Sequence, residues 1–473
     1  MYRLFRYLFV ASALIAISAG SLHAKPKAKY VIYFIGDGMG LNQVLGGSIL
    51  ASQLAGDKDG YMAFPFLEFP VKTYATSRAS NTYITDSAAS GTALATGEKT
   101  NSGMVGVLSD GETPVTSIAF DAKKAGYKVG IASNVGVNHA TPASFYAHDK
   151  SRDHYYAIGL QLPESGFDFF AGSNFLTDQR GTEKPLLKTV ARDAGYTVAF
   201  GVDQYNALKS KSSKMVLFQA DSTSTDVAYR IDRKPNDLTL SQITSSAIEF
   251  LTKENDKGFF LMIEAGRIDF AGHSNDAAAT FHEVIDLAEA VDVALDFYKK
   301  HAKETLIVVT ADHETGAMSL GAAGKYELNF SALSNQKLSK DALRDRIGAL
   351  RREKNNRVSW ADAKALLQET LGFWKEVSIS MPQEIRLMQV YHESLGAARP
   401  NPPSSSSDDK LAVAAVTIMN EIALVGWSSG GHSAAVIPVY AMGAGSELFH
   451  TADLLDNTDL PKIIAKIAGY SAK

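Results

Sequence analysis

The sequence of 473 residues contains no cysteine. This absence excludes disulfide bonds, cysteine-ligated zinc and a lipoprotein anchor, so any bound metal must be held by His, Asp, Glu or hydroxyl groups. The chain also lacks a block of basic residues, and its formal net charge is -4. A nucleic acid is therefore not expected as a partner.

Long apolar runs are missing as well. The run from Leu8 to Ala19 is too short to span a membrane comfortably. It follows Arg3 and Arg6 and leads into small residues through Ala24, a pattern typical of a secretory signal peptide. We therefore expect residues 1–24 to be removed and residues 25–473 to be exported, to the periplasm or outside the cell, with no membrane span. The alternative is a core strand or helix of the fold.

What the chain does contain is an alternation of short apolar runs and amphipathic stretches. Most of the runs are apolar on both alternating faces, as expected for strands covered by helices on each side. This alternation predicts a three-layer α/β/α sandwich with a largely parallel central sheet. The strand candidates are 31–35, 128–132, 215–219, 259–263, 306–310 and 436–442.

Two further segments are predicted from their composition. The clearest amphipathic helix runs from Asp276 to Lys300, with Asn275 as its expected N-cap. Residues 320–424 interrupt the alternation with helix-rich sequence that contains a Pro- and Ser-rich stretch at 400–409. We interpret this region as an insertion into the main domain, with a surface loop inside it.

Residues with metal-ligand side chains cluster just after the strand candidates. Open α/β sheets bind ligands at the carboxyl ends of their strands, so this position is informative. Buried Asp and Glu are uncommon unless they are paired or bound to metal, and the combined spacing therefore favours a metal site over ordinary turns. The residues are Asp37, Glu264, Asp269, His273, Asp312 and His313, and His432 precedes the last strand candidate. The role of His148 stays open.

Ser87 begins a run of small residues within Thr82–Ala93. Such a run is typical of a helix start that packs closely under a bound group, where backbone N–H groups and the helix dipole face an anion. The alternative is a capped helix whose serine is solvated.

In these motifs and in their order, the sequence resembles the alkaline phosphatase family from about Tyr30 to Gly443. The resemblance implies hydrolysis of phosphate monoesters through a covalent phosphoserine on Ser87, with two Zn ions and one Mg ion as cofactors. One zinc would be held by Asp269, His273 and His432 and would stabilise the leaving oxygen and activate water. The second, held by Asp37, Asp312 and His313, would bind the Ser87 oxygen.

The resemblance also implies a third metal site and a phosphate clamp. The third ion, usually Mg, would take Asp37, Glu264 and Thr141, and Arg152 would grip the phosphate. His139 stands where some bacterial members carry Asp, so this ion is expected to be held more through water. Phe270 stands where relatives often carry a polar or bulky aromatic side chain, and we expect fewer direct hydrogen bonds to the phosphate there.

Three alternative functions remain to be compared with the sequence. A sulfatase would need a Cys or Ser in a C/S-x-P-x-R context, which the residues after Ser87 lack. A phosphodiesterase on the same scaffold usually carries Thr as nucleophile and no Arg clamp. A catalytically inert phosphate- or metal-binding protein of the cell envelope would not need every catalytic position filled. Because the family is commonly dimeric, the resemblance implies a homodimer.

Activity should rise from mild acid into alkaline pH, because protons compete with the metals for the histidine ligands.

Overall fold

The computed structural model describes residues 28–57, 60–178, 182–221, 225–395 and 409–470. The expected signal peptide and nearly all of the stretch 400–409 lie outside the described residues. Among the described residues, no helix combines the length and the apolar character needed to cross a membrane.

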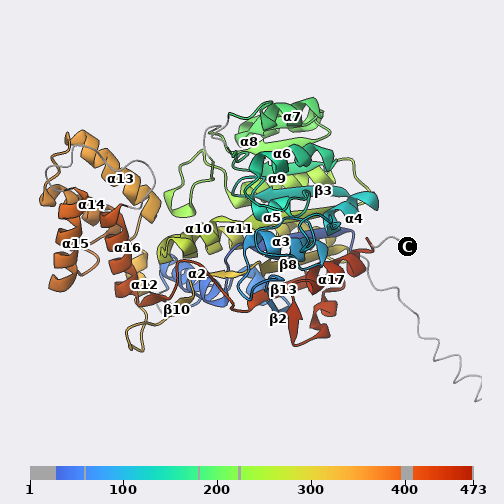
Figure 1. Ribbon diagram of the computed structural model, residues 1–473. Coiled ribbons are helices and arrows are strands. Elements are labelled where there is room, and N and C mark those ends of the chain that lie inside the picture. The colour runs from blue at the N-terminus through green and yellow to red at the C-terminus, as the bar shows by residue number, and fades with distance from the viewer. Residues whose placement is uncertain (1–27, 58–59, 179–181, 222–224, 396–408, 471–473) are drawn as a thin grey trace, which may run out of the picture.

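A ten-stranded sheet forms the centre of the molecule (Figure 1). Neighbouring strands run parallel, except that β13 is antiparallel to both of its neighbours. The predicted largely parallel sheet is confirmed. From edge to edge the strands are β14 (Leu454–Asp456), β2 (Val71–Thr76), β13 (Ile437–Gly443), β8 (Thr305–Ala311), β1 (Tyr30–Gly36), β7 (Phe259–Ala265), β3 (Lys128–Ser133), β4 (Phe169–Gly172), β6 (Met215–Phe218) and β5 (Thr197–Phe200).

The central strands are buried on both faces because helices cover the sheet on each side. Every residue of β1, β7 and β8 is buried, as expected for near-continuous apolar runs in a parallel sheet. One layer contains α2 (Leu41–Leu54), α9 (Leu240–Thr252) and α11 (Ala277–His301), and the other contains α3 (Ser87–Thr96), α4 (Ile118–Lys124), α5 (Ala140–Ala143) and α17 (Asp459–Ala468). The three-layer prediction is therefore confirmed.

Shorter helices cover the edge of the sheet around β5 and β6. They are α6 (Tyr155–Glu164), α7 (Leu187–Asp193) and α8 (Gly201–Leu208), with 3₁₀ turns at Pro65–Glu68, Lys209–Lys211, Arg230–Asp232 and Ser446–Thr451. The short helix α10 (Arg267–His273) joins β7 to α11. One boundary was predicted wrongly, because Asp276 rather than Asn275 caps α11 and accepts a hydrogen bond from the Ala279 N–H.

Five helices stand beside this three-layer body (Figure 1). The chain enters them through β10 (Met318–Leu320) and leaves them through β11 (Val425–Trp427), and these two strands pair antiparallel. We refer to residues 321–424 as the insertion. Its helices are α12 (Phe330–Leu333), α13 (Lys340–Glu353), α14 (Trp360–Leu371), α15 (Met381–Ser394) and α16 (Lys410–Ala423). A second small pair joins β9 (Glu314–Thr315) to β12 (His432–Ser433).

Candidate active site

The register of the sheet brings the predicted carboxylates together at one edge. Gly36, the last residue of β1, pairs with Ala265 of β7 and with Ala311 of β8. The residues that follow β1 and β8, Asp37 and Asp312, therefore emerge side by side. Glu264 lies one residue before the end of β7 and completes the row.

Three groups of candidate metal ligands result from this arrangement. Within each group the ligand atoms lie within 4.8 Å of one another. The groups are Asp269, His273 and His432; Asp37, Asp312 and His313; and Asp37, His139 and Glu264, so that Asp37 is shared between two of them. We call the first group the outer triad and the second the inner triad, because the inner residues are fully buried whereas the His273 side chain is 41% exposed.

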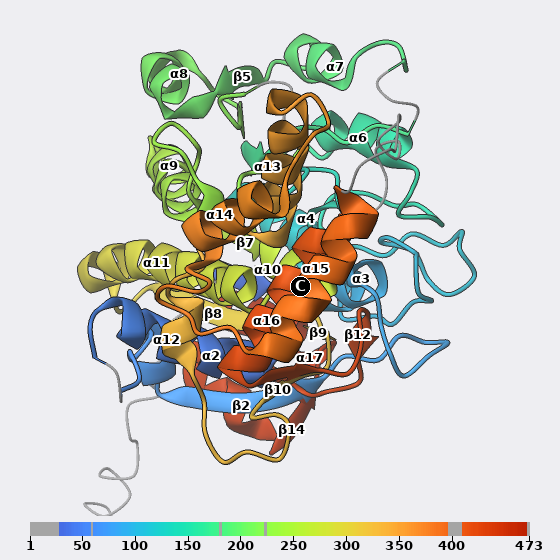
Figure 2. The same cartoon turned by 90° about the vertical axis from the view of Figure 1, so that its left-hand side faces the viewer.

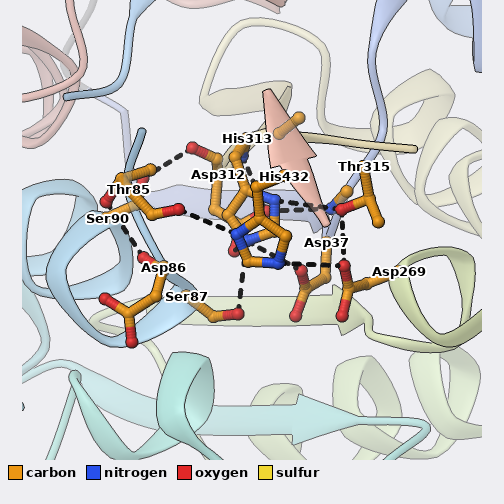
Figure 3. A network of polar contacts seen from close by, with 12 residues as sticks. Asp37, Thr85, Asp86, Ser87, Ser90, Asp269, Asp312, His313, Thr315 and His432 are labelled. Atoms are coloured by element: carbon orange, nitrogen blue, oxygen red, sulfur yellow. Dashed lines mark hydrogen bonds and ion pairs between the residues drawn. The ribbon is translucent and has the colours of Figure 1, made fainter. Parts of the chain in front are cut away.

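Ser87 lies at the first position of α3 and faces these groups. Its Oγ is 3.3 Å from His313 Nε2, and Figure 3 shows Ser87 among the side chains of this site. Asp86 is the N-cap of α3 and accepts from the Ala89 N–H at 3.1 Å, and Gly97 ends the helix in a left-handed conformation. The predicted helix start at Ser87 is confirmed, and with it a backbone N–H array beside the Ser87 hydroxyl.

Arg152 is held on the same side by two contacts. Its Nη1 donates to Asp86 Oδ2 at 3.0 Å and its Nη2 donates to His139 Nε2 at 3.0 Å. A guanidinium carries five N–H groups, so further donors remain for a ligand. Burial and the neighbouring Arg152 lower the pKa of His139 to about 3, so this imidazole is neutral and accepts from the arginine.

The Nδ1 atoms of the two outer histidines each contact a backbone carbonyl oxygen. His273 Nδ1 contacts Gly430 O at 2.7 Å, and His432 Nδ1 contacts Thr85 O at 2.8 Å. Since a carbonyl oxygen only accepts, each Nδ1 carries a proton, and each Nε2 is directed toward Asp269 and the site. The two Nε2 atoms are 3.1 Å apart. Hydrogen bonds of this kind, from the ring nitrogen that does not bind the metal to a backbone oxygen, orient histidine ligands of metals.

The pKa values of the carboxyl groups in the site are shifted in opposite directions. Burial and the Asp312 charge hold the pKa of Asp37 well above its usual range, and burial raises the pKa of Glu264 to about 7. Burial also opposes ionisation of Asp269, but hydrogen bonds from His273 and His432 outweigh it and keep the pKa of Asp269 well below its usual range. Asp269 in turn raises the pKa of His273 to about 9.

Several buried polar atoms of the site accept or donate no hydrogen bond among the described residues. They are both carboxylate oxygens of Asp37, Asp312 Oδ2, Glu264 Oε1, Thr141 Oγ1 and His139 Nδ1. Unpaired buried carboxylate oxygens cost several kcal/mol unless a cation compensates them. Carboxylate and imidazole donors of this kind suit zinc, and a set made mainly of oxygen donors suits Mg. The residues therefore fit the metal ions that the sequence predicted.

Three residues that support the site were not predicted from the sequence. Asp86 orients Arg152, Ser133 Oγ donates to Glu264, and Thr315 Oγ1 lies 2.5 Å from Asp269 Oδ1 and 3.3 Å from His313 Nδ1. Asp86 and Thr315 directly neighbour predicted motifs, and that adjacency was the available signal. His148 lies outside the site, with its Nδ1 2.6 Å from Gly106 O. Phe270 packs edge to face against His139, with ring centroids 5.8 Å apart.

Comparisons with known proteins agree on one family. A family model described as "Alkaline phosphatase" matches residues 28–180 and 179–470. Alkaline phosphatase 3 of Bacillus subtilis is 32% identical over 455 residues, which is 94% of this chain and 90% of the relative.

Solved structures give the same result. A cold-active alkaline phosphatase from a psychrophilic Shewanella sp. superposes with a TM-score of 0.78 at 28% identity, over 93% of this chain and 99% of that one. A variant of the TAB5 alkaline phosphatase, with Mg bound in its M3 site, superposes with a TM-score of 0.65 at 26% identity, over 95% and 100%.

Proposed function

Because this chain belongs to the alkaline phosphatase family, we propose that it hydrolyses phosphate monoesters through a phosphoserine on Ser87, at a site that holds two Zn ions and one Mg ion. One observation carries the proposal. Buried carboxylate oxygens that accept no hydrogen bond from the described residues converge beside a serine at a helix N-terminus. Such a site needs cations to be stable, and a phosphate group is what its serine and arginine both fit.

Each proposed ion has its own set of ligands. The outer triad would hold one zinc and the inner triad the other, whereas Asp37, Glu264 and Thr141, with His139 nearby, would hold Mg. Bound zinc supplies Lewis acidity and lowers the pKa of water from about 15.7 to about 7. The Mg assignment rests on the oxygen donors of Asp37, Glu264 and Thr141, because Mg prefers oxygen ligands.

The side chains of the protein divide the remaining work. The Ser87 hydroxyl loses its proton and its oxygen attacks phosphorus, so that a Ser87 O–P bond forms, the ester P–O bond breaks, and the leaving oxygen takes up a proton from solvent to give the alcohol. A water molecule then attacks phosphorus and breaks the Ser87 O–P bond, which regenerates the serine hydroxyl and releases inorganic phosphate. Arg152, held by Asp86 and His139, grips two phosphate oxygens at once through its planar fork. A diester would have to bring its second ester group into this grip, which favours monoesters.

The proposal is tested by substrate preference. We expect a much higher kcat/KM for p-nitrophenyl phosphate than for bis(p-nitrophenyl) phosphate, with activity lost on chelation and restored by Zn and Mg. Ser87→Ala should lower kcat by roughly 10³-fold or more, as removal of a catalytic nucleophile does elsewhere, while phosphate still binds. A preference for the diester, or wild-type turnover in Ser87→Ala, would contradict the proposal.

We further propose that the chain is exported, on the basis of its N-terminal sequence pattern alone. Mass spectrometry of the protein purified from its native host would check this point, because an exported chain should begin near residue 25. A mature protein that retains Met1 would contradict it.

A further inference from the structure

The two ends of the insertion lie next to candidate metal ligands. His313 and Thr315 precede β10, where the chain enters the insertion, and His432 follows β11, where it leaves. The strands β10 and β11 hold these two ends together. Contacts that hold the insertion against the main body therefore also help to position the loop that carries His432.

Asn420 of α16 fixes the insertion to the turn between α10 and α11. Its Nδ2 donates to Asn275 O at 2.6 Å, and its Oδ1 accepts from the Ala277 N–H at 3.3 Å. Both backbone groups belong to helix ends, where intrahelical partners are missing. Figure 2 looks onto the insertion and shows α16 in front of α10 and α11. Asn420 is buried, so its amide is committed to this turn.

A second contact joins the insertion to the same turn. Asp276, which caps α11, accepts from Gln336 Nε2 at 2.9 Å and from the Lys340 N–H at 2.7 Å. Asp276 is buried, and its carboxylate needs these donors because burial raises its pKa. The turn at residues 275–276 is thus held from the insertion by one side chain on α16 and by two groups near the start of α13.

The same turn is tied to the loop that precedes His432. Asn275 has a φ of 49°, and its amide nitrogen, when turned toward the carbonyls, reaches Ser429 O and Gly272 O at 3.0 Å. Two residues earlier, His273 Nδ1 contacts Gly430 O at 2.7 Å. The turn and the loop therefore meet at successive residues. His273 is the most exposed candidate ligand, so these contacts largely determine its orientation.

We propose that the insertion braces the outer triad, and that Asn420 is a positioning residue that acts on His273 through Asn275. This inference rests on the proposed function, because it takes the outer triad to bind zinc. The inner triad follows β1 and β8 and is fully buried, and among the described residues no hydrogen bond joins residues 275–276 to it. Loss of these contacts should therefore weaken the binding of one zinc ion and leave the binding of the other unchanged.

The test measures zinc release from the full-length, zinc-loaded protein to a chromogenic chelator. In Asn420→Leu we expect one zinc per chain to leave up to about tenfold faster, because loss of a group bonded directly to a ligand typically costs 10–100-fold in affinity and Asn420 acts through Asn275. The other zinc should leave at the wild-type rate, and excess zinc should restore activity. His273→Ala identifies the phase that belongs to the outer triad. Lys410→Gln, which removes an exposed ion pair on the same helix, should leave both phases unchanged.

Asn275→Gly provides a second, milder test. Glycine adopts a φ of 49° without strain, so this variant removes only the amide contacts to Ser429 O and Gly272 O. It should also accelerate release of the outer zinc alone. The brace is rejected if folded Asn420→Leu and Asn275→Gly release both ions at wild-type rates, or accelerate both equally. A wild-type protein that binds no zinc rejects the proposed function itself, and the brace with it.

Discussion

Thr315 determines how protons are distributed among the ligand side chains of the two triads. Its hydroxyl has a single proton, and the 2.5 Å contact to Asp269 Oδ1 uses it, because a carboxylate can only accept. The oxygen must then accept from His313 Nδ1, 3.3 Å away. His313 Nε2 is therefore unprotonated and faces Ser87 and Asp37, at 3.3 and 3.4 Å. A single hydroxyl thus hydrogen-bonds to one side chain of each triad.

At the residue scale, zinc binding to protein whose metals have been removed by a chelator should release a proton from His273. Asp269 raises the pKa of His273 to about 9, so at pH 7 this imidazole is protonated and zinc must displace the proton. Affinity of the outer triad should therefore rise between pH 7 and pH 9 and then level off. Calorimetric zinc titrations in buffers of different ionisation enthalpy measure the released proton.

His273→Ala is the control for this titration, and it should release correspondingly fewer protons on zinc binding. Buffer-independent heats for the wild-type protein at pH 7 would contradict the expectation.

Most candidate ligands could be predicted from the sequence because each follows an apolar run, where the end of a strand exposes it. The supporting residues could not be predicted in the same way. Ser133 and Thr315 are short hydroxyl side chains with ordinary local context, and their partners Glu264 and Asp269 are distant in sequence. Asn275 was predicted as an N-cap, but its positive φ makes it the linker between two helices. Local pattern alone does not distinguish these two uses of asparagine.

At the scale of elements, the contact between α3 and α5 links Ser87 to the predicted third ion. Gly91 allows this contact, because a Cβ there would lie 2.9 Å from Ser144 Oγ and 3.2 Å from Thr141 Cα. Gly91→Val should push α5 away and move Thr141. We expect the Mg concentration for half-maximal activation to rise, with a loss of about 1–3 kcal/mol in stability from overpacking.

Gly348→Ala on α13 is the matched control, because its Cβ would meet nothing closer than 3.6 Å. It should leave Mg activation unchanged. Unaltered Mg activation in folded Gly91→Val would show that α5 does not depend on this contact.

The strands differ in how well the sequence indicates them. The long buried runs of β1, β7 and β8 were predicted within a few residues, because a chain buried on both faces needs continuous apolar sequence. The sheet also contains β2, whose exposed and buried residues alternate, and the four-residue strands β4 and β5, and these were not predicted. The antiparallel direction of β13 depends on chain connectivity and leaves no mark in its own residues.

For the whole molecule, Asp232 makes docking of the insertion sensitive to pH. Its Oδ1 accepts from the Ser339 N–H at 2.8 Å, and burial raises its pKa to about 6. A carboxyl whose folded pKa exceeds its unfolded value of about 3.9 contributes stability that is present below pH 4 and is lost as pH rises to about 6. The stability advantage of Asp232→Asn over wild type should therefore grow by about 2 kcal/mol between pH 4.5 and pH 7.

Urea unfolding of the metal-free wild-type and Asp232→Asn proteins across this pH range measures the difference in stability. Asparagine keeps the acceptor for Ser339, so a constant difference at all pH values would mean that Asp232 is ionised throughout. The sequence could not predict this contact, because Asp232 and Ser339 lie on opposite sides of the catalytic motifs and nothing local indicates that they meet.

The pairing of β1 also constrains when the protein can fold during synthesis. Tyr30 lies beside Phe259 and Thr305, so the middle of the sheet cannot close until two thirds of the chain has left the ribosome. Contacts this distant in sequence make folding slow. His432, the last candidate ligand, emerges later still, and the metal site is therefore among the last parts to assemble. A nascent chain that stays open for so long suits the proposed export, because a chain that has not yet folded can pass through a secretion channel.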